Sequence, residues 1–155
     1  GNNKNSWLKD KVILAACDKD IMANVVGYFF NYQYPEVGIE WNSGDSMVRK
    51  YCFQLLTGDA VDNISGIKYL TKDIQEKYGL RKSSGCGKVS AEGILGKCKG
   101  RKEMLSAVID AYKSSWPDDY KERLQDMGFF LWLGREEKEM FSFDKYTEKM
   151  GVEYD

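Results

Sequence analysis

Residues 55–67 read Leu-Leu-Thr-Gly-Asp-Ala-Val-Asp-Asn-Ile-Ser-Gly-Ile. The first part of this stretch closes a predicted helix that ends at about Thr57, where Gly58 stops it. Residues 59–66 are rich in Asp, Asn, Ser and Gly, a composition typical of a turn. The chain is therefore expected to leave a helix and reverse direction here, with acidic side chains in the reversal.

Two pairs of aspartates are candidate cation sites. Asp59 and Asp62 lie three residues apart in the turn, so their carboxylates point the same way. Asp18 and Asp20 follow an apolar strand-like run, at the strand end where α/β sheets place ligands, and project to one side. Carboxylates packed this closely are tolerated mainly when a divalent cation neutralises them. The alternatives stay open: a surface Asp-x-Asp, and an Asp-x-x-Asp that only caps a turn.

Hydrophobic periodicity predicts the other elements. The run at residues 11–17, Lys-Val-Ile-Leu-Ala-Ala-Cys, predicts a strand buried on both faces of a parallel sheet. Aromatic stretches at residues 28–32 and 38–41 predict a hairpin or two edge strands. One helix is predicted to begin at residue 43 or 45 and to end at residue 57. Further helices are predicted over residues 71–78, 88–95, 101–114 and 117–133, and within 141–155. In the helix at residues 117–133, Phe130 is expected to face inward.

A glycine turn precedes the helix predicted at residues 88–95. In Gly85-Cys86-Gly87-Lys88, two glycines expose backbone N–H groups just before a helix begins. Such groups can approach a phosphate, and the helix dipole assists. The alternative is a glycine turn with no ligand.

Composition narrows the chemistry. The 155 residues contain no histidine, which excludes histidine general bases and triads, and the four cysteines form no Cys-x-x-Cys pair. Carboxylates remain, and they favour Mg²⁺ or Mn²⁺. Cys17 and Cys52 are expected to be small buried hydrophobes. The longest apolar run is too short to span a bilayer, so no membrane partner and a cytoplasmic location are expected.

Charge is unevenly distributed along the chain. The total is only −1, but residues 68–102 contain ten Lys or Arg against three Asp or Glu, a net of +7, which leaves −8 for the remainder. A cationic segment on an acidic body fits a phosphate-binding surface beside a metal-binding carboxylate cluster. A solvated lysine-rich loop is the alternative.

The order of these motifs resembles the 5′-nuclease family. Cys-Asp-Lys-Asp at residues 17–20 is followed by the stretch at residues 55–67 and by Gly-Cys-Gly-Lys-Val-Ser-Ala-Glu-Gly-Ile-Leu at residues 85–95. The family includes the 5′-nuclease domain of bacterial DNA polymerase I, flap endonucleases and bacteriophage 5′→3′ exonucleases, which look most similar. Residues 129–143 also look like the closing segment of the phage enzymes, and the resemblance covers most of residues 11–143.

The resemblance implies an α/β fold: the C-terminal part of a 5′-nuclease (PIN-like) domain, followed by a helical helix–three-turn–helix region. It also implies hydrolysis of DNA phosphodiesters with two Mg²⁺ or Mn²⁺ ions. The metal ligands and catalytic residues are then Asp18, Asp20, Asp59 and Asp62. Residues 65–95 match the element that grips the duplex backbone, often with a bound K⁺ ion. The implied DNA contacts are Lys82, Gly85, Gly87, Lys88 and Ser90.

Two departures from the family qualify this interpretation. A basic segment at residues 68–84 is inserted where the family has only a few residues, and it either widens the DNA contact or decorates a loop. The family's N-terminal half, with its further carboxylates, has no counterpart. The expected parts are the end of the nuclease core at residues 1–57, the DNA-binding element at 58–100 and C-terminal helices at 101–155.

Three roles follow from these observations. The favoured one is the C-terminal half of a 5′→3′ exonuclease or flap endonuclease from a bacterial or phage-infected cell, with the N-terminal half either truncated or a separate polypeptide. This chain alone is expected to be weak or inactive. The second is a non-catalytic, structure-specific DNA-binding module. The third is a protein–protein or structural role.

Overall fold

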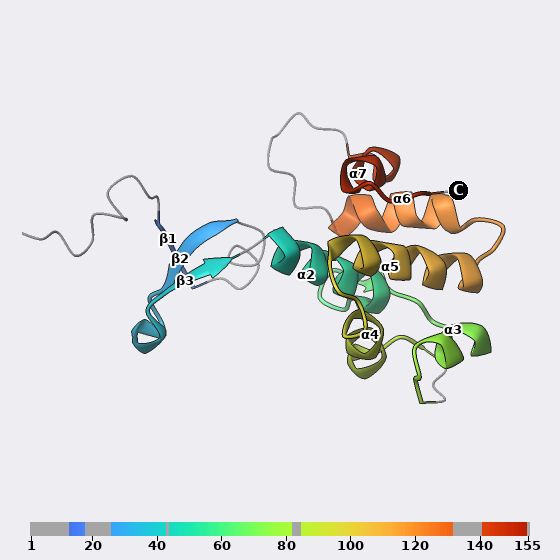
Figure 1. Ribbon diagram of the computed structural model, residues 1–155, viewed down its shortest axis with the longest axis horizontal. Helices are drawn as coiled ribbons and strands as arrows, with labels where there is room; N and C mark the ends of the chain where they lie inside the picture. The colour runs from blue at the N-terminus through green and yellow to red at the C-terminus, as the bar shows by residue number, and fades with distance from the viewer. Residues whose placement is uncertain (1–12, 18–25, 43, 82–84, 132–140, 155) are drawn as a thin grey trace, which may run out of the picture. The chain divides into compact units, whose positions relative to one another are not determined.

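The computed structural model describes residues 13–17, 26–42, 44–81, 85–131 and 141–154 (Figure 1). The described residues form both helices and small sheets, which confirms an α/β protein in the general sense. The chain divides into two compact units, Gly1–Met47 and Val48–Asp155, and the division falls inside a helix.

The described part of the first unit is a three-stranded sheet. Its strands are β1 (Ile13–Ala16), β2 (Gly27–Asn31) and β3 (Ile39–Asn42), with a 3-10 turn, η2 (Pro35–Val37), before β3. β1 pairs with β2 in parallel, and β2 pairs with β3 in antiparallel orientation. The predicted strand and the predicted aromatic hairpin are therefore both confirmed.

The expectation that the first strand is buried on both faces is wrong. Ala15 is exposed, and Ile13 and Leu14 are only half-buried. Side chains alternate along strands, so the pairing register places six apolar residues together on one side. We call these residues the apolar sheet face: Ile13, Ala15, Tyr28, Phe30, Ile39 and Trp41. Trp41 remains 58% exposed and Ile39 44% exposed on it.

Helix α2 (Gly44–Thr57) leads into the second unit, as predicted. Its buried side chains from Val48 to Leu56 recur at helical spacing. Gly58 has a φ of +77°, a left-handed conformation that glycine adopts at low cost, and it ends the helix.

The second unit is helical. Its further helices are α3 (Lys72–Lys77), α4 (Lys88–Leu95), α5 (Arg101–Ser115), α6 (Tyr120–Leu131) and α7 (Phe143–Met150). α5 is central and contacts each of the other four (Figure 1). Its Tyr112 is buried and donates a 2.6 Å hydrogen bond to the carbonyl oxygen of Leu55. That carbonyl lies in the last turn of α2, where no intrahelical donor remains.

Three details differ from the sequence-based expectations. α6 begins at Tyr120 rather than at Pro117, because residues 117–119 form a turn in which the Asp119 N–H donates to the Trp116 carbonyl at 3.3 Å. Phe130 does not face inward, since it is 65% exposed. Cys52 is buried as expected, whereas Cys17 is half-exposed, its thiol 2.9 Å from the Tyr32 hydroxyl. No helix in the described residues combines the length and apolarity needed to cross a bilayer.

Candidate nucleic-acid interface

The aspartate turn is a short hairpin. Its strands, β4 (Gly58–Asp59) and β5 (Ile64–Ser65), are antiparallel. Asp59 Oδ1 accepts the N–H of Val61 at 2.9 Å and, more weakly, that of Asp62 at 3.4 Å. The Asp59 carboxylate therefore holds the turn in shape, a role that the sequence left open beside metal binding.

Two glycines close the base of the hairpin. A Cβ atom on Gly66 would overlap the carbonyl oxygen of Leu56 and the carbonyl carbon of Thr57, and one on Gly58 would overlap the backbone of residues 64–66. Ile67 N–H donates to the Leu56 carbonyl at 3.0 Å across the same contact. The hairpin is thus fixed against the end of α2 by backbone packing that leaves no room for a side chain.

The two aspartates of this turn differ in exposure. Asp59 is half-buried, and Asp62 is exposed. Within the described residues, no group of three or more Asp, Glu or Cys side chains gathers as metal ligands would. Asp18 and Asp20 lie outside the described residues, so convergence of the two pairs stays a prediction.

The glycine turn begins α4, as predicted. Gly87 is the N-cap residue, and its carbonyl accepts the Ala91 N–H at 2.9 Å. A Cβ atom on Gly87 would meet nothing within 4 Å, so the backbone there is open to a ligand. Of the other predicted DNA contacts, Lys88 is exposed and Ser90 half-buried, whereas Lys82 lies outside the described residues.

Cys86 fixes the turn to the rest of the unit. The side chain is only 5% exposed, and burial raises the pKa of its thiol to about 12. Its N–H donates a 3.0 Å hydrogen bond to the carbonyl of Ile67. Gly85 packs closely too, since a Cβ atom on it would lie 3.4 Å from the Lys68 carbonyl oxygen. Residues 67–68 and 85–86 therefore lie side by side, although 17 residues separate Ile67 from Gly85.

The basic segment at residues 68–84, interpreted from the sequence as an insertion, contains a helix that belongs to the core. Leu70, Ile74 and Tyr78 are buried in the hydrophobic cluster of the unit. The Thr71 hydroxyl contacts that of Ser114, and Ser115 Oγ donates to the Tyr69 carbonyl at 2.7 Å. The segment is thus packed against α5, and the simple picture of a solvated lysine-rich loop does not describe it.

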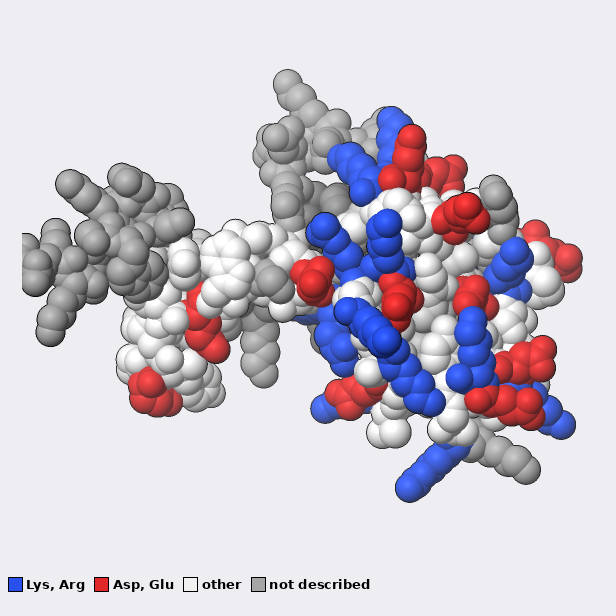
Figure 2. All heavy atoms as spheres, in the orientation of Figure 1, with Lys and Arg blue, Asp and Glu red and all other residues white. Residues whose placement is uncertain are grey.

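The basic residues of this region fall into two groups. Lys77 forms an ion pair with Asp110 at 2.6 Å, and Lys97 Nζ donates to the Tyr78 carbonyl. Lys68, Arg81 and Lys88 are exposed, and none of them has an ion-pair partner among the described residues. On the face of the second unit seen in Figure 2, Lys and Arg are interspersed with Asp and Glu.

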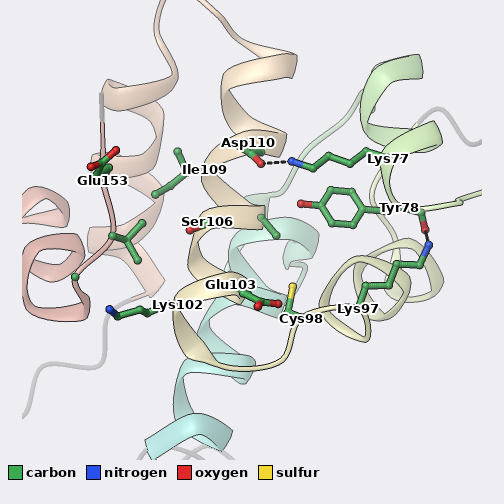
Figure 3. A pocket seen from close by; sticks show the side chains of 13 residues that line it. Lys77, Tyr78, Lys97, Cys98, Lys102, Glu103, Ser106, Ile109, Asp110 and Glu153 are labelled. Carbon is green, nitrogen blue, oxygen red and sulfur yellow. Dashed lines mark hydrogen bonds and ion pairs between the residues drawn. The ribbon is translucent and has the colours of Figure 1, made fainter.

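A cavity of about 550 Å³ is lined by the end of α3, residues 97–98, one side of α5 and the segment after α7 (Figure 3). No motif in the sequence had indicated it. Three lysines line it, but so do Glu103, Asp110 and Glu153. Its charges cancel, so it offers no net attraction for a polyanion. The charge balance of the cavity therefore does not favour it as a phosphate-binding site.

In comparisons with known proteins, no family model, no curated protein and no solved structure matches this chain.

Proposed function

We propose that this chain is the C-terminal half of a metal-dependent 5′→3′ DNA exonuclease or flap endonuclease. Residues 58–95 bind the phosphate backbone of duplex DNA, and the aspartates contribute ligands to divalent ions. The N-terminal half of the enzyme, either truncated or a separate polypeptide, supplies the remaining carboxylates. The apolar sheet face is a surface on which another layer can pack.

The observation that carries this proposal is the hydrogen bond from Cys86 N–H to the Ile67 carbonyl. It joins the two motifs that the family keeps close in sequence and that this chain separates by the inserted segment. The hairpin with Asp59 and Asp62 is part of the first of these motifs, residues 55–67. The motifs at residues 55–67 and 85–95 are thus neighbours in the sequence order of the family and also in space, which supports treating them as one DNA-binding element.

The groups that bind phosphate lie at the N-terminal end of α4. Its first N–H groups and the positive end of its dipole attract anions, and Gly87 leaves the approach open. Lys88 adds an exposed cation at the first helical position. These groups recognise a backbone phosphate and not a base, so the binding is independent of DNA sequence.

Asp59 and Asp62 are hard oxygen donors, which suit Mg²⁺ or Mn²⁺. Since Asp59 Oδ1 is engaged by the turn amides, Oδ2 is the oxygen that would face an ion. Bound divalent ions would activate a water molecule and stabilise the leaving oxygen. The four aspartates Asp18, Asp20, Asp59 and Asp62 would suffice for one ion, but a second ion would have too few protein ligands. The isolated chain is therefore expected to cleave DNA weakly or not at all.

A non-catalytic duplex-binding module is the second candidate. The turn-capping role of Asp59 favours it, because that role explains an acidic residue at this position without any metal. DNA binding is common to both candidates, and metal-dependent cleavage separates them.

DNA binding is tested with a fluorescently labelled 5′-flapped duplex in EDTA, by anisotropy at several NaCl concentrations. Lys88→Ala should flatten the plot of log affinity against log salt by about 0.9, the value for one lost phosphate contact. Lys145→Ala is the matched control, because Lys145 is an exposed lysine on α7, which packs on α5 and α6. Equal slopes for wild type and Lys88→Ala would contradict the assignment of the turn.

Metal binding is tested with Asp59→Asn. Asparagine keeps the Oδ1 acceptor that holds the turn, so the fold should persist and, without metal, gain slightly from lost carboxylate repulsion. The affinity for Mn²⁺ and any Mn²⁺-dependent cleavage with the N-terminal half should fall together. Unchanged Mn²⁺ titration in this variant would favour the non-catalytic module.

A further inference from the structure

The charge of the inserted segment lies at its two ends. Residues 68–84 contain five Lys or Arg and two Asp or Glu, a net of +3. Within α3, Lys72 and Lys77 are balanced by Asp73 and Glu76. The net positive charge of the segment therefore comes from the residues that flank α3 in the sequence: Lys68 before it, and Arg81 and Lys82 after it.

Lys68 is held beside the glycine turn. Its carbonyl oxygen packs on Gly85, and the preceding carbonyl, that of Ile67, accepts the Cys86 N–H at 3.0 Å. The stretch is anchored on both sides, since Ile67 and Leu70 are buried. The backbone is thus fixed, while the Lys68 side chain is exposed.

Arg81 is held beside α4. The preceding residue, Leu80, donates its N–H to the Gln75 carbonyl at 2.8 Å. The Leu80 side chain lies against Gly93 of α4, where a Cβ atom would come within 2.8 Å of it. Arg81 is exposed next to this contact and has no ion-pair partner among the described residues.

We propose that Lys68 and Arg81, at the two ends of the inserted segment, form a second phosphate contact that extends the footprint of the glycine turn on duplex DNA. This inference rests on the proposed function. α3 itself acts as a spacer that packs on α5 and contributes no net charge to the DNA surface. The inserted segment therefore enlarges the DNA interface through its ends and not through its helix.

The test uses the full chain, the same flapped duplex in EDTA, and NaCl from 50 to 200 mM. The variants are Lys68→Gln, Arg81→Gln and the double variant, because glutamine removes the charge and keeps most of the stem. Each single change should flatten the salt slope by about 0.9 and the double change by about 1.8. When NaCl is raised from 50 to 200 mM, the affinity of a single variant should therefore fall about 3.5-fold less than the affinity of wild type does.

Lys72→Gln is the matched control, because Lys72 is an exposed lysine of the same segment on the charge-balanced helix. Its slope should equal that of wild type. The inference is overturned if the double variant keeps the wild-type slope while Lys88→Ala still flattens it, which leaves the proposed function intact. It is also overturned if Lys72→Gln flattens the slope as much as Lys68→Gln. Absence of any salt-dependent binding by wild type would remove both proposals.

Discussion

Gly58 and Gly66 form a backbone contact at the base of the aspartate hairpin that excludes every side chain. Gly66→Ala should therefore lower the free energy of unfolding by about 3 kcal/mol, the upper part of the range for overpacking. Gly87→Ala is the matched change, since the space around Gly87 is open and its φ of −81° suits alanine. It should cost under about 1 kcal/mol as a poorer N-cap, while weakening DNA binding. Urea unfolding of both variants checks this, and equal losses would contradict the packing argument.

The buried thiol of Cys86 makes stability depend on alkaline pH. Its pKa is about 12 in the folded protein, against 9.0 for an ordinary cysteine. Between these values the unfolded chain loses the proton first, so stability is complete below about pH 9 and falls as the pH rises towards 12. From pH 8 to pH 10, wild type should lose about 1 kcal/mol more than Cys86→Ala. Parallel urea titrations at the two pH values measure the difference; equal losses would mean that the thiol is accessible to water.

The structural roles of some of these residues could be predicted from the residue type, and those of others could not. Glycine at positions 58 and 87 signalled a helix stop and a helix start, because both signals are local. The hydrogen bond from Tyr112 to Leu55 could not be foreseen, since it joins residues 57 apart in the chain. The exposure of Phe130 was missed for a similar reason: periodicity shows which residues are apolar, but neighbouring elements decide which of them are covered.

At the scale of elements, the role of α3 differs most from the sequence-based expectation, which was a DNA contact or a loop at residues 68–84. Ile74 is 4% exposed and packs in the main cluster. Ile74→Ala should cost about 2–4 kcal/mol, the usual loss for a buried isoleucine. Glu76→Ala, an exposed position on the same helix, should cost little. Thermal unfolding of the two variants measures this difference. If neither variant loses stability, α3 does not pack in the core.

Helix boundaries were predictable where a cap residue marks them. Thr71 accepts the Ile74 N–H and Gly79 follows α3 with a φ of +61°, so both ends of this short helix carried a sequence signal. α6 starts late because Pro117 tolerates a turn as readily as a first helical turn. The adjacency of Ile67 and Cys86 had no local signal, since it depends on how α3 packs.

At the scale of the whole molecule, the hydrophobic core belongs to the second unit. Every member of the main cluster, from Val48 to Phe143, lies beyond the division at Met47. A fragment of residues 44–155 should therefore unfold cooperatively and keep a helical circular dichroism spectrum. A fragment that melts without cooperativity would show that the first unit contributes to this core.

The aspartate pairs illustrate what a sequence can say at this scale. Chemistry and order along the chain suggested that Asp18 and Asp20 share a site with Asp59 and Asp62. Bringing them together depends on the packing of whole units, for which no residue pattern gives a rule. The glycine turn and its helix were easier, because all their determinants lie within residues 85–95.

The hydrogen bond from Cys86 to Ile67 also provides a natural reporter of motion. An amide held in this way exchanges its proton with deuterated water only when the bond opens. The exchange rate of this one amide therefore measures how often the base of the inserted segment separates from the glycine turn. If the segment opens as a block, the amides of α3 should exchange together with it, and bound duplex should slow all of them by the same factor.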